Sequence, residues 1–102
     1  VDFLVQPGEP VYAPISGRMR FARPYRDDTY YEGISIQGEQ YEVKIFYLNT
    51  WLAPGLKRDV KAGDEIGKAQ AISQKYGPAM KDHIHVDVLI DQKNIDPTNF
   101  FL

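Results

Sequence analysis

The chain has 102 residues, enough for one domain with a modest core, and we expect residues 1–102 to form a single domain. Its 12 basic and 14 acidic side chains give a formal charge of −2 without blocks of like charge, which argues against a nucleic-acid partner. No apolar run approaches the roughly 20 residues of a membrane span, and the absence of cysteine excludes disulfides and thiolate metal sites.

The first stretch with strand character runs from Val11 to Ala22. Val11 to Ala13 is followed by Pro14 and by Ser16-Gly17, and Arg18 to Ala22 then alternates polar and apolar side chains. Alternation on both sides of a turn is typical of a β-hairpin. We therefore predict a hairpin at the beginning of a sheet.

A polar loop rich in tyrosine follows, from Arg23 to Glu32. It carries Tyr25, Tyr30 and Tyr31 close to Arg23 and Arg26. Tyrosine and arginine are enriched among the residues that dominate protein interfaces, so this loop can serve as a binding rim. An ordinary polar loop would have the same composition, and both interpretations stay open.

Two more strands are predicted on either side of the turn at Gln37 to Gln40. Ile34 and Ile36 mark the first strand, and Tyr41 to Leu48 forms the second. The second carries apolar or aromatic side chains on both of its faces, which is typical of a strand that is covered on both sides. We expect it to be central in the sheet.

The segment from Asn49 to Lys57 is expected to carry a short helical turn that stops at Pro54-Gly55, with Trp51 covering the core. After it, Val60 to Gly67 contains a Gly-Asp turn that leads into a short strand with Ile66 pointing inward. These elements together predict an all-β fold with few short helical turns.

The only two histidines of the chain are His83 and His85, in an alternating run that ends at Ile90. Strand periodicity places both imidazoles and Asp87 on one face, roughly 6.8 Å apart between successive positions. Two such imidazoles can approach one metal ion, water molecule or carbonyl group. A His-x-His pair can also simply line a wet sheet face, so the spacing permits a site without establishing one. The opposite face carries Ile84, Val86, Val88 and Ile90.

Several short motifs follow one another in a fixed order along the chain. They are Val1-Asp2, Val11-Tyr12-Ala13-Pro14 with Gly17, Gly33 and Gly38 around a short strand, Val43 to Leu48, Val60 to Asp64 with Ile66-Gly67, His83-x-His85 and Asp96-Pro97. In this order they resemble the lysostaphin-type zinc endopeptidase fold and, within it, most closely the leukocyte cell-derived chemotaxin branch. The resemblance covers nearly the whole chain and implies a mainly antiparallel sheet with a groove.

The resemblance implies zinc as the cofactor, with Asp2 and His85 as metal ligands and His83 as the base beside the attacking water. Oxygen and imidazole ligands with one open position suit hydrolytic zinc chemistry. The family's third ligand is a histidine four residues before Asp2, upstream of this chain. We expect that the domain was trimmed at its N-terminus, because the sequence begins within this motif and without methionine. Two protein ligands alone would hold zinc weakly.

Active peptidases of the family carry a further histidine in a Tyr-x-His-Leu segment, which is similar here to Ile45-Phe46-Tyr47-Leu48. Tyr47 therefore occupies the place of a catalytic histidine. A phenol with a reference pKa near ~10 can donate a hydrogen bond but cannot relay protons near neutrality as imidazole does. His83 would then be a vestigial base, and we expect that the chain is not a peptidase.

Three functions are compatible with these features. The first is a non-catalytic, secreted, metallopeptidase-like module that binds a receptor or matrix protein. The second is an active zinc endopeptidase that cleaves glycine-rich or peptidoglycan cross-bridge peptides. The third is a biotinyl- or lipoyl-type carrier, which Val11 to Gly17 and Val60 to Asp64 resemble. A carrier needs a lysine at a hairpin tip, whereas Lys44 lies within a predicted strand, so we rank this function last.

Overall fold

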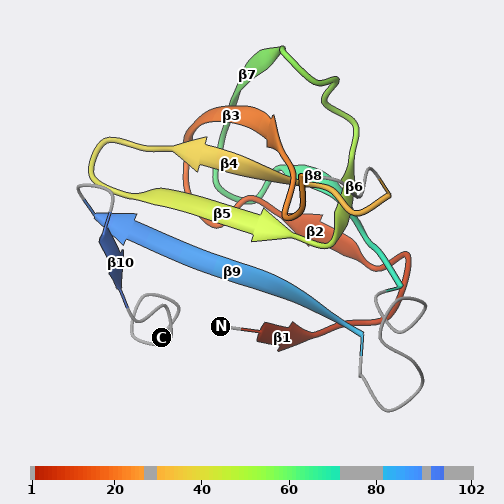
Figure 1. The fold of residues 1–102 in the computed structure, drawn as a ribbon. Coiled ribbons are helices and arrows are strands. Elements are labelled where there is room, and N and C mark those ends of the chain that lie inside the picture. The colour runs from red at the N-terminus through yellow and green to blue at the C-terminus, as the bar shows by residue number, and fades with distance from the viewer. Residues whose placement is uncertain (1, 27–29, 72–81, 91–92, 96–102) are drawn as a thin grey trace.

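The computed structural model describes residues 2–26, 30–71, 82–90 and 93–95, and all regular elements within them are β-strands (Figure 1). No helix occurs in these ranges, which confirms the all-β prediction, and none of the described residues belongs to a helix able to cross a membrane. The strands are β1 (Asp2–Leu4), β2 (Pro10–Tyr12), β3 (Gly17–Ala22), β4 (Gly33–Gln37), β5 (Glu42–Phe46), β6 (Leu48–Thr50), β7 (Lys57–Val60), β8 (Glu65–Ala69), β9 (His83–Ile90) and β10 (Lys93–Ile95).

The strands form two antiparallel sheets of unequal size. The larger has seven strands in the order β1-β9-β5-β4-β3-β7, with β10 pairing a second part of β9. The smaller has three strands in the order β2-β8-β6. Because β5 lies between β4 and β9, the prediction that this strand is central is confirmed (Figure 1).

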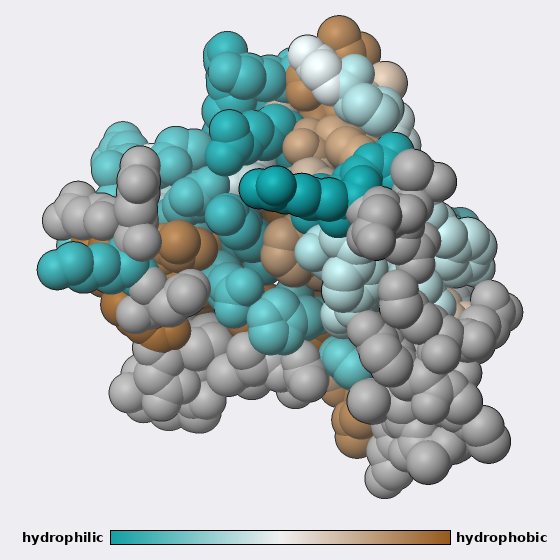
Figure 2. All heavy atoms as spheres, in the orientation of Figure 1, coloured by the Kyte–Doolittle hydropathy of each residue, from teal (hydrophilic) through white to brown (hydrophobic). Residues whose placement is uncertain are grey.

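The hydrophobic core lies against one face of the larger sheet. Ile36, Val43 and Val88 are fully buried there, and Leu48 and Ile66 of the smaller sheet belong to the same cluster. The alternate positions of the same strands are largely polar, because successive side chains of a strand point to opposite faces. The larger sheet thus has an apolar face in the core and a polar face. In the view of Figure 2, hydrophilic side chains predominate over β3, β4 and β5.

The predicted hairpin between residues 11 and 22 is wrong, since its two strands lie in different sheets. Val11 on β2 pairs with Gly67 on β8, whereas β3 pairs with β4 and β7. After β2 the chain is tied to the turn before β8. The amide of Ala13 donates to the Asp64 carbonyl at 2.8 Å, and the amide of Gly63 donates to the Ala13 carbonyl at 2.8 Å. Alternation along the sequence predicts strands correctly but cannot identify their partners.

The alternation of β5 ends at Tyr47, which has a φ of 69°. A non-glycine residue in this left-handed region is uncommon, and here three backbone hydrogen bonds hold it. The amides of Tyr47 and Leu48 donate to the Glu32 carbonyl at 2.9 and 3.1 Å, and the Gln70 amide donates to the Tyr47 carbonyl at 2.9 Å. The turn redirects the chain from the larger sheet into the smaller one. Leu48, which simple alternation places on the face of Phe46, is therefore fully buried in the core.

The expected helical turn between Asn49 and Lys57 is also wrong, because β6 occupies its first residues and turns and bends connect β6 to β7. Trp51 does not cover the core. Its side chain is 51% exposed, its indole N–H donates to the Glu65 carbonyl at 3.0 Å, and the Arg58 guanidinium lies 5.7 Å from its ring centre. The neighbouring Leu52 is buried instead.

The turn predicted before the inward-pointing isoleucine is confirmed. The amide of Lys61 donates to the Asp64 carboxylate at 2.8 Å, and the amide of Asp64 donates to the Lys61 carbonyl at 2.9 Å. Gly63 has a φ of +93°, a conformation that glycine adopts without steric cost. Ile66 is fully buried.

Candidate functional site

The two histidines lie on β9, on the polar face of the larger sheet. The alternate residues Val86 and Val88 are buried in the core, which fixes the orientation of the whole strand. His83 is 8% exposed, and the side chain of His85 is 36% exposed. His83 is therefore the covered histidine of the pair, and His85 is the one that a ligand can reach from solvent.

The strand register brings the second residue of the chain next to the second histidine. In the antiparallel pair of β1 and β9, Asp2 lies directly opposite His85 and Leu4 lies opposite His83. On the other side of β9, Phe46 of β5 lies opposite His85. The side chain of Asp2 is outside the described part of the structure, so Asp2 enters the site through its backbone position alone.

His85 is oriented by two neighbours. Its Nε2 atom lies 3.0 Å from Oδ1 of Asp87, and because a carboxylate can only accept, the imidazole N–H donates in this bond. In the neutral ring the lone pair then lies on Nδ1. The ring of Phe46 is nearly parallel to that of His85, at 13° with centroids 6.5 Å apart. One face and one edge of the imidazole are therefore fixed by the sheet itself.

His83 contacts Tyr47, the residue at the turn between the two sheets. The two rings meet edge to face, with centroids 5.4 Å apart and planes at 87°. The left-handed backbone of Tyr47 and the backbone hydrogen bonds of Tyr47 and Leu48 position this ring. The structure thus brings the three predicted residues His83, His85 and Tyr47 together at one end of β9.

Tyr47 also belongs to a cluster of tyrosines, and this cluster is a part of the site that the sequence did not identify. The hydroxyls of Tyr25 and Tyr47 are hydrogen bonded at 2.7 Å. Tyr31 packs edge-on against Tyr25 and Tyr47, with centroids 6.3 and 5.8 Å away, and is buried. Of the three tyrosines predicted as a binding rim, only Tyr30 is largely exposed. Tyr25 and Tyr31 instead form a wall beside His83 and Tyr47.

A buried glutamine supports this wall from behind. Gln70 is 3% exposed, and its side-chain amide donates to the Tyr30 carbonyl at 2.8 Å and to the Asn49 side chain at 3.1 Å. Its side-chain carbonyl accepts from the Glu32 amide at 3.0 Å. All three polar positions of this side chain are therefore engaged. Gln70 links the tyrosine loop to the smaller sheet across long sequence separations, which no local sequence pattern could indicate.

Imidazole and carboxylate donors are the ligand types that zinc accepts in proteins. His83 and His85 supply two imidazoles at one end of the polar face, and the backbone of Asp2 lies opposite the second. Within the described part of the chain, no group of three or more histidine, cysteine, aspartate or glutamate side chains is arranged around one metal position. The donor chemistry of these residue types fits zinc.

Comparison with known proteins gives matches along the chain. The profile of peptidase family M23 matches residues 1–97. Leukocyte cell-derived chemotaxin-2 of Mus musculus is 32% identical over 102 residues, which cover 98% of this chain and 63% of that protein. The chemotaxin-2 homolog of Caenorhabditis elegans is 30% identical over 107 residues, which cover 97% of this chain and 32% of that protein. The chain thus spans less than two thirds of either relative.

Two solved structures are similar to this chain in fold. The solution structure of lysostaphin has a TM-score of 0.72 at 22% identity, over 99% of this chain and 41% of that one. The catalytic domain of lysostaphin from Staphylococcus simulans has a TM-score of 0.67 at 20% identity, over 98% of this chain and 75% of that one. At these identities the likeness establishes the fold alone.

Proposed function

The chain belongs to peptidase family M23, and we propose that it is a non-catalytic, extracellular relative of these peptidases that acts by binding a protein. Family M23 is generally zinc-dependent. The proposed module keeps part of a zinc site, formed by Asp2 and His85, and uses the polar face of the larger sheet to contact a cell-surface receptor or a matrix protein. Among the curated relatives reported above, both are named chemotaxins, and this supports the choice.

The observation that carries the proposal is the environment of Tyr47. Its ring contacts His83, where a second imidazole would assist catalysis in an active peptidase, and its hydroxyl is hydrogen bonded to Tyr25. A phenol in this position can donate a hydrogen bond but cannot move protons near neutral pH. Removing one such stabilising group from a hydrolytic site lowers turnover by about 10²–10³.

An active zinc endopeptidase is the second candidate, and the register of β1 and β9 favours it. Asp2 lies opposite His85 in the backbone register, which supports a shared role of the two residues as ligands. A bound zinc ion would lower the pKa of a water ligand and polarise the carbonyl to be attacked. In that case His83 would hold the proton taken from the water, and the hydroxyl of Tyr25 or Tyr47 would stabilise the developing oxyanion.

A cleavage assay separates the two candidates. We expect the zinc-supplemented protein to cleave pentaglycine peptides and peptidoglycan at a rate at least about 10²–10³-fold lower than that of lysostaphin, because the second imidazole is missing. The release of new amino termini measures this rate. Cleavage at a rate near that of lysostaphin, lost on chelation and in the His85→Ala variant, would establish the peptidase and refute the non-catalytic role.

The carrier alternative receives no support from the position of its lysine. Lys44 lies in the middle of β5, opposite Ser35 on one side and Asp87 on the other. Carrier domains present their lysine at an exposed turn, where a modifying enzyme can reach it. Lys44 instead lies within the central strand of the larger sheet, away from any turn.

Asp87 is expected to position His85 for zinc, because the hydrogen bond between them fixes the tautomer of the ring. We expect Asp87→Ala to weaken zinc binding by about 10- to 100-fold, and Asp87→Asn, which keeps an acceptor oxygen, to weaken it less. Competition with a fluorescent chelator measures the affinity. Asp59→Ala is the matched control, since it removes the same charge from a carboxylate that pairs with Arg18. Equal losses in Asp87→Ala and Asp59→Ala would contradict the positioning role.

A further inference from the structure

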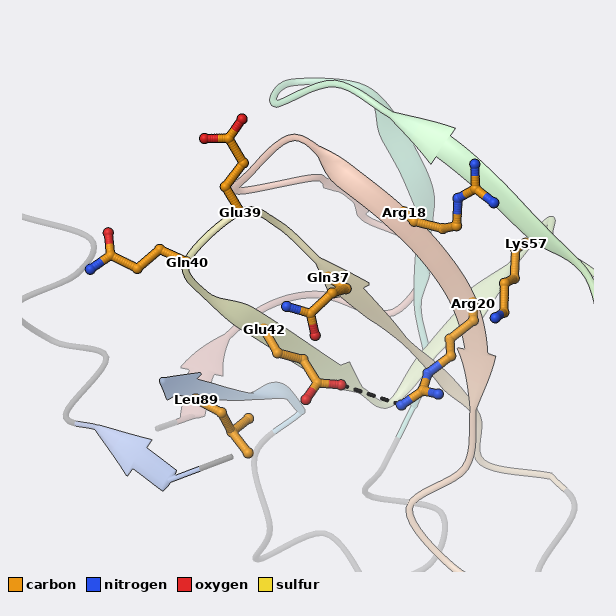
Figure 3. A pocket seen from close by; sticks show the side chains of 8 residues that line it. All are labelled: Arg18, Arg20, Gln37, Glu39, Gln40, Glu42, Lys57 and Leu89. Carbon is orange, nitrogen blue, oxygen red and sulfur yellow. Dashed lines mark hydrogen bonds and ion pairs between the residues drawn. The ribbon is translucent and has the colours of Figure 1, made fainter. Parts of the chain in front are cut away.

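The polar face of the larger sheet contains a hollow of about 580 Å³ beyond the histidines (Figure 3). One side of the hollow is bordered by the side chains of Arg18 and Arg20 on β3 and of Lys57 on β7. The side at the turn between β4 and β5 carries Glu39 and Gln40. Gln37, Glu42 and Leu89 complete the lining.

The hollow and the histidine site lie on the same face of the larger sheet, and the register relates their positions. Arg20 lies opposite Lys57 and Ser35, Ser35 lies opposite Lys44, and Lys44 lies opposite Asp87. These residues form one row across the polar face, and the adjacent row contains His85. By standard strand spacings, Arg20 lies roughly 16 Å from His85, a distance that about five residues of an extended peptide would span.

A partly buried network contacts Arg20, whose own side chain is 58% exposed. The Glu42 side chain is 14% exposed, and its Oε2 atom accepts from the Ser35 hydroxyl at 2.6 Å and from Nη2 of Arg20 at 3.4 Å. Ser35 itself is 2% exposed. The contact to Glu42 occupies one nitrogen of the Arg20 guanidinium and leaves further N–H donors of its fork for a ligand.

The other two cations are as accessible as Arg20. Arg18 pairs with Asp59 at 3.1 Å, but their side chains are 61% and 78% exposed, so this ion pair is weak and easily exchanged. Lys57 is exposed and forms no ion pair with any residue that the structure describes. Arginine forks bind carboxylates through two parallel hydrogen bonds, and lysine adds a point charge.

We propose that this hollow binds a single carboxylate of an acidic peptide segment in the protein partner, about five residues from the segment that contacts the histidines. The proposal rests on the proposed protein-binding function. The lining carries three cations and the carboxylates of Glu39 and Glu42, and Asp59 pairs with Arg18 from outside it. Displacing the exposed Asp59 from Arg18 would leave one positive charge in the lining. That balance suits one carboxylate, whereas a polyanion would be repelled by the two acids.

The test is an NMR titration of the isotope-labelled protein with acetylated pentaglycyl-glutamate amide and with its glutamine counterpart. We expect the glutamate peptide to shift amide signals of β3 and β7 and to bind about tenfold more tightly at low salt, because only its carboxylate is charged. The Arg20→Gln/Lys57→Gln double variant is expected to remove this preference. Arg58→Gln, on the opposite face of β7, is expected to keep it.

Equal affinity for the two peptides, no binding of either at millimolar concentration, or an equal loss in Arg58→Gln would overturn the carboxylate subsite. Tighter binding of a heparin fragment or inorganic phosphate than of the glutamate peptide would overturn it in favour of another anion. None of these results bears on peptidase activity. The proposed function fails only if the cleavage assay detects peptidase activity, so the two failures are distinguishable.

Discussion

Replacing His85 by alanine is expected to lower the affinity of the full-length protein for zinc by roughly a hundredfold or more, a greater loss than removal of a supporting partner causes. His83→Ala is expected to lower it by less than about tenfold. His85 is accessible, lies opposite Asp2 in the sheet and receives a fixed tautomer from Asp87. His83 is covered and contacts Tyr47 instead. Chelator competition on each purified variant gives the two affinities.

His83 has a packing role that the comparison must take into account. Its ring fills a covered position against Tyr47, so His83→Ala is expected to reduce stability as well. The zinc affinities are therefore measured at a temperature where circular dichroism shows both variants fully folded. Equal losses of affinity in folded His83→Ala and His85→Ala would indicate that both histidines are ligands. An unchanged affinity in His85→Ala would remove His85 from the metal site.

The strands with strong alternation could be predicted from the sequence, and their partners could not. The β9 pattern places histidines and aliphatic residues on opposite faces, and Val86 and Val88 are indeed buried. The hairpin from residue 11 to residue 22 failed because β2 pairs with β8, more than fifty positions later in the chain. Such pairing depends on which apolar faces can be buried together in three dimensions, and a local pattern contains no record of it.

The resemblance to the peptidase fold, its chemotaxin branch included, is confirmed by the family match, the curated relatives and the lysostaphin structures. The motif at Asp96-Pro97 lies outside the described residues. The metal ligands Asp2 and His85 stay predictions. The sequence could not indicate that the Tyr25 hydroxyl reaches Tyr47, because the contact depends on the left-handed turn at Tyr47.

This turn is the physical link between the fold and the site. In a regular strand, the alternation of β5 would continue through Tyr47, and the Leu48 side chain would lie on the same face of the sheet as that of Phe46. The positive φ instead buries Leu48 and places the Tyr47 ring against His83. A strained backbone that positions a side chain in a site is maintained only when surrounding contacts hold it, as the Glu32 and Gln70 hydrogen bonds do here.

Gly33→Ala is expected to lower the free energy of unfolding by roughly 3 kcal/mol or more, because the new methyl group would meet the backbone of β5 as well as the Phe46 ring. A Cβ atom at Gly33 would overlap the Ile45 carbonyl oxygen and would lie 2.8 Å from Cδ1 and 2.9 Å from Cα of Phe46. Gly33 is paired with Phe46 in the sheet, and Phe46 in turn is paired with His85. Zinc affinity should therefore fall together with stability, since β5 must move away. Denaturant unfolding and chelator competition measure the two effects.

Gly55→Ala separates this backbone overlap from the general cost of losing a glycine. Gly55 has a φ of +83° and no atom within 4 Å of its added Cβ, so this variant meets only the strain of the left-handed conformation. That strain costs about 1–2 kcal/mol. Gly55 lies between β6 and β7, outside the strands β1, β5 and β9 that carry the histidine site, so zinc affinity should not change. Similar stability losses in Gly33→Ala and Gly55→Ala would mean that β4 and β5 can separate at little cost. Their close approach would then not be what holds Phe46 against His85.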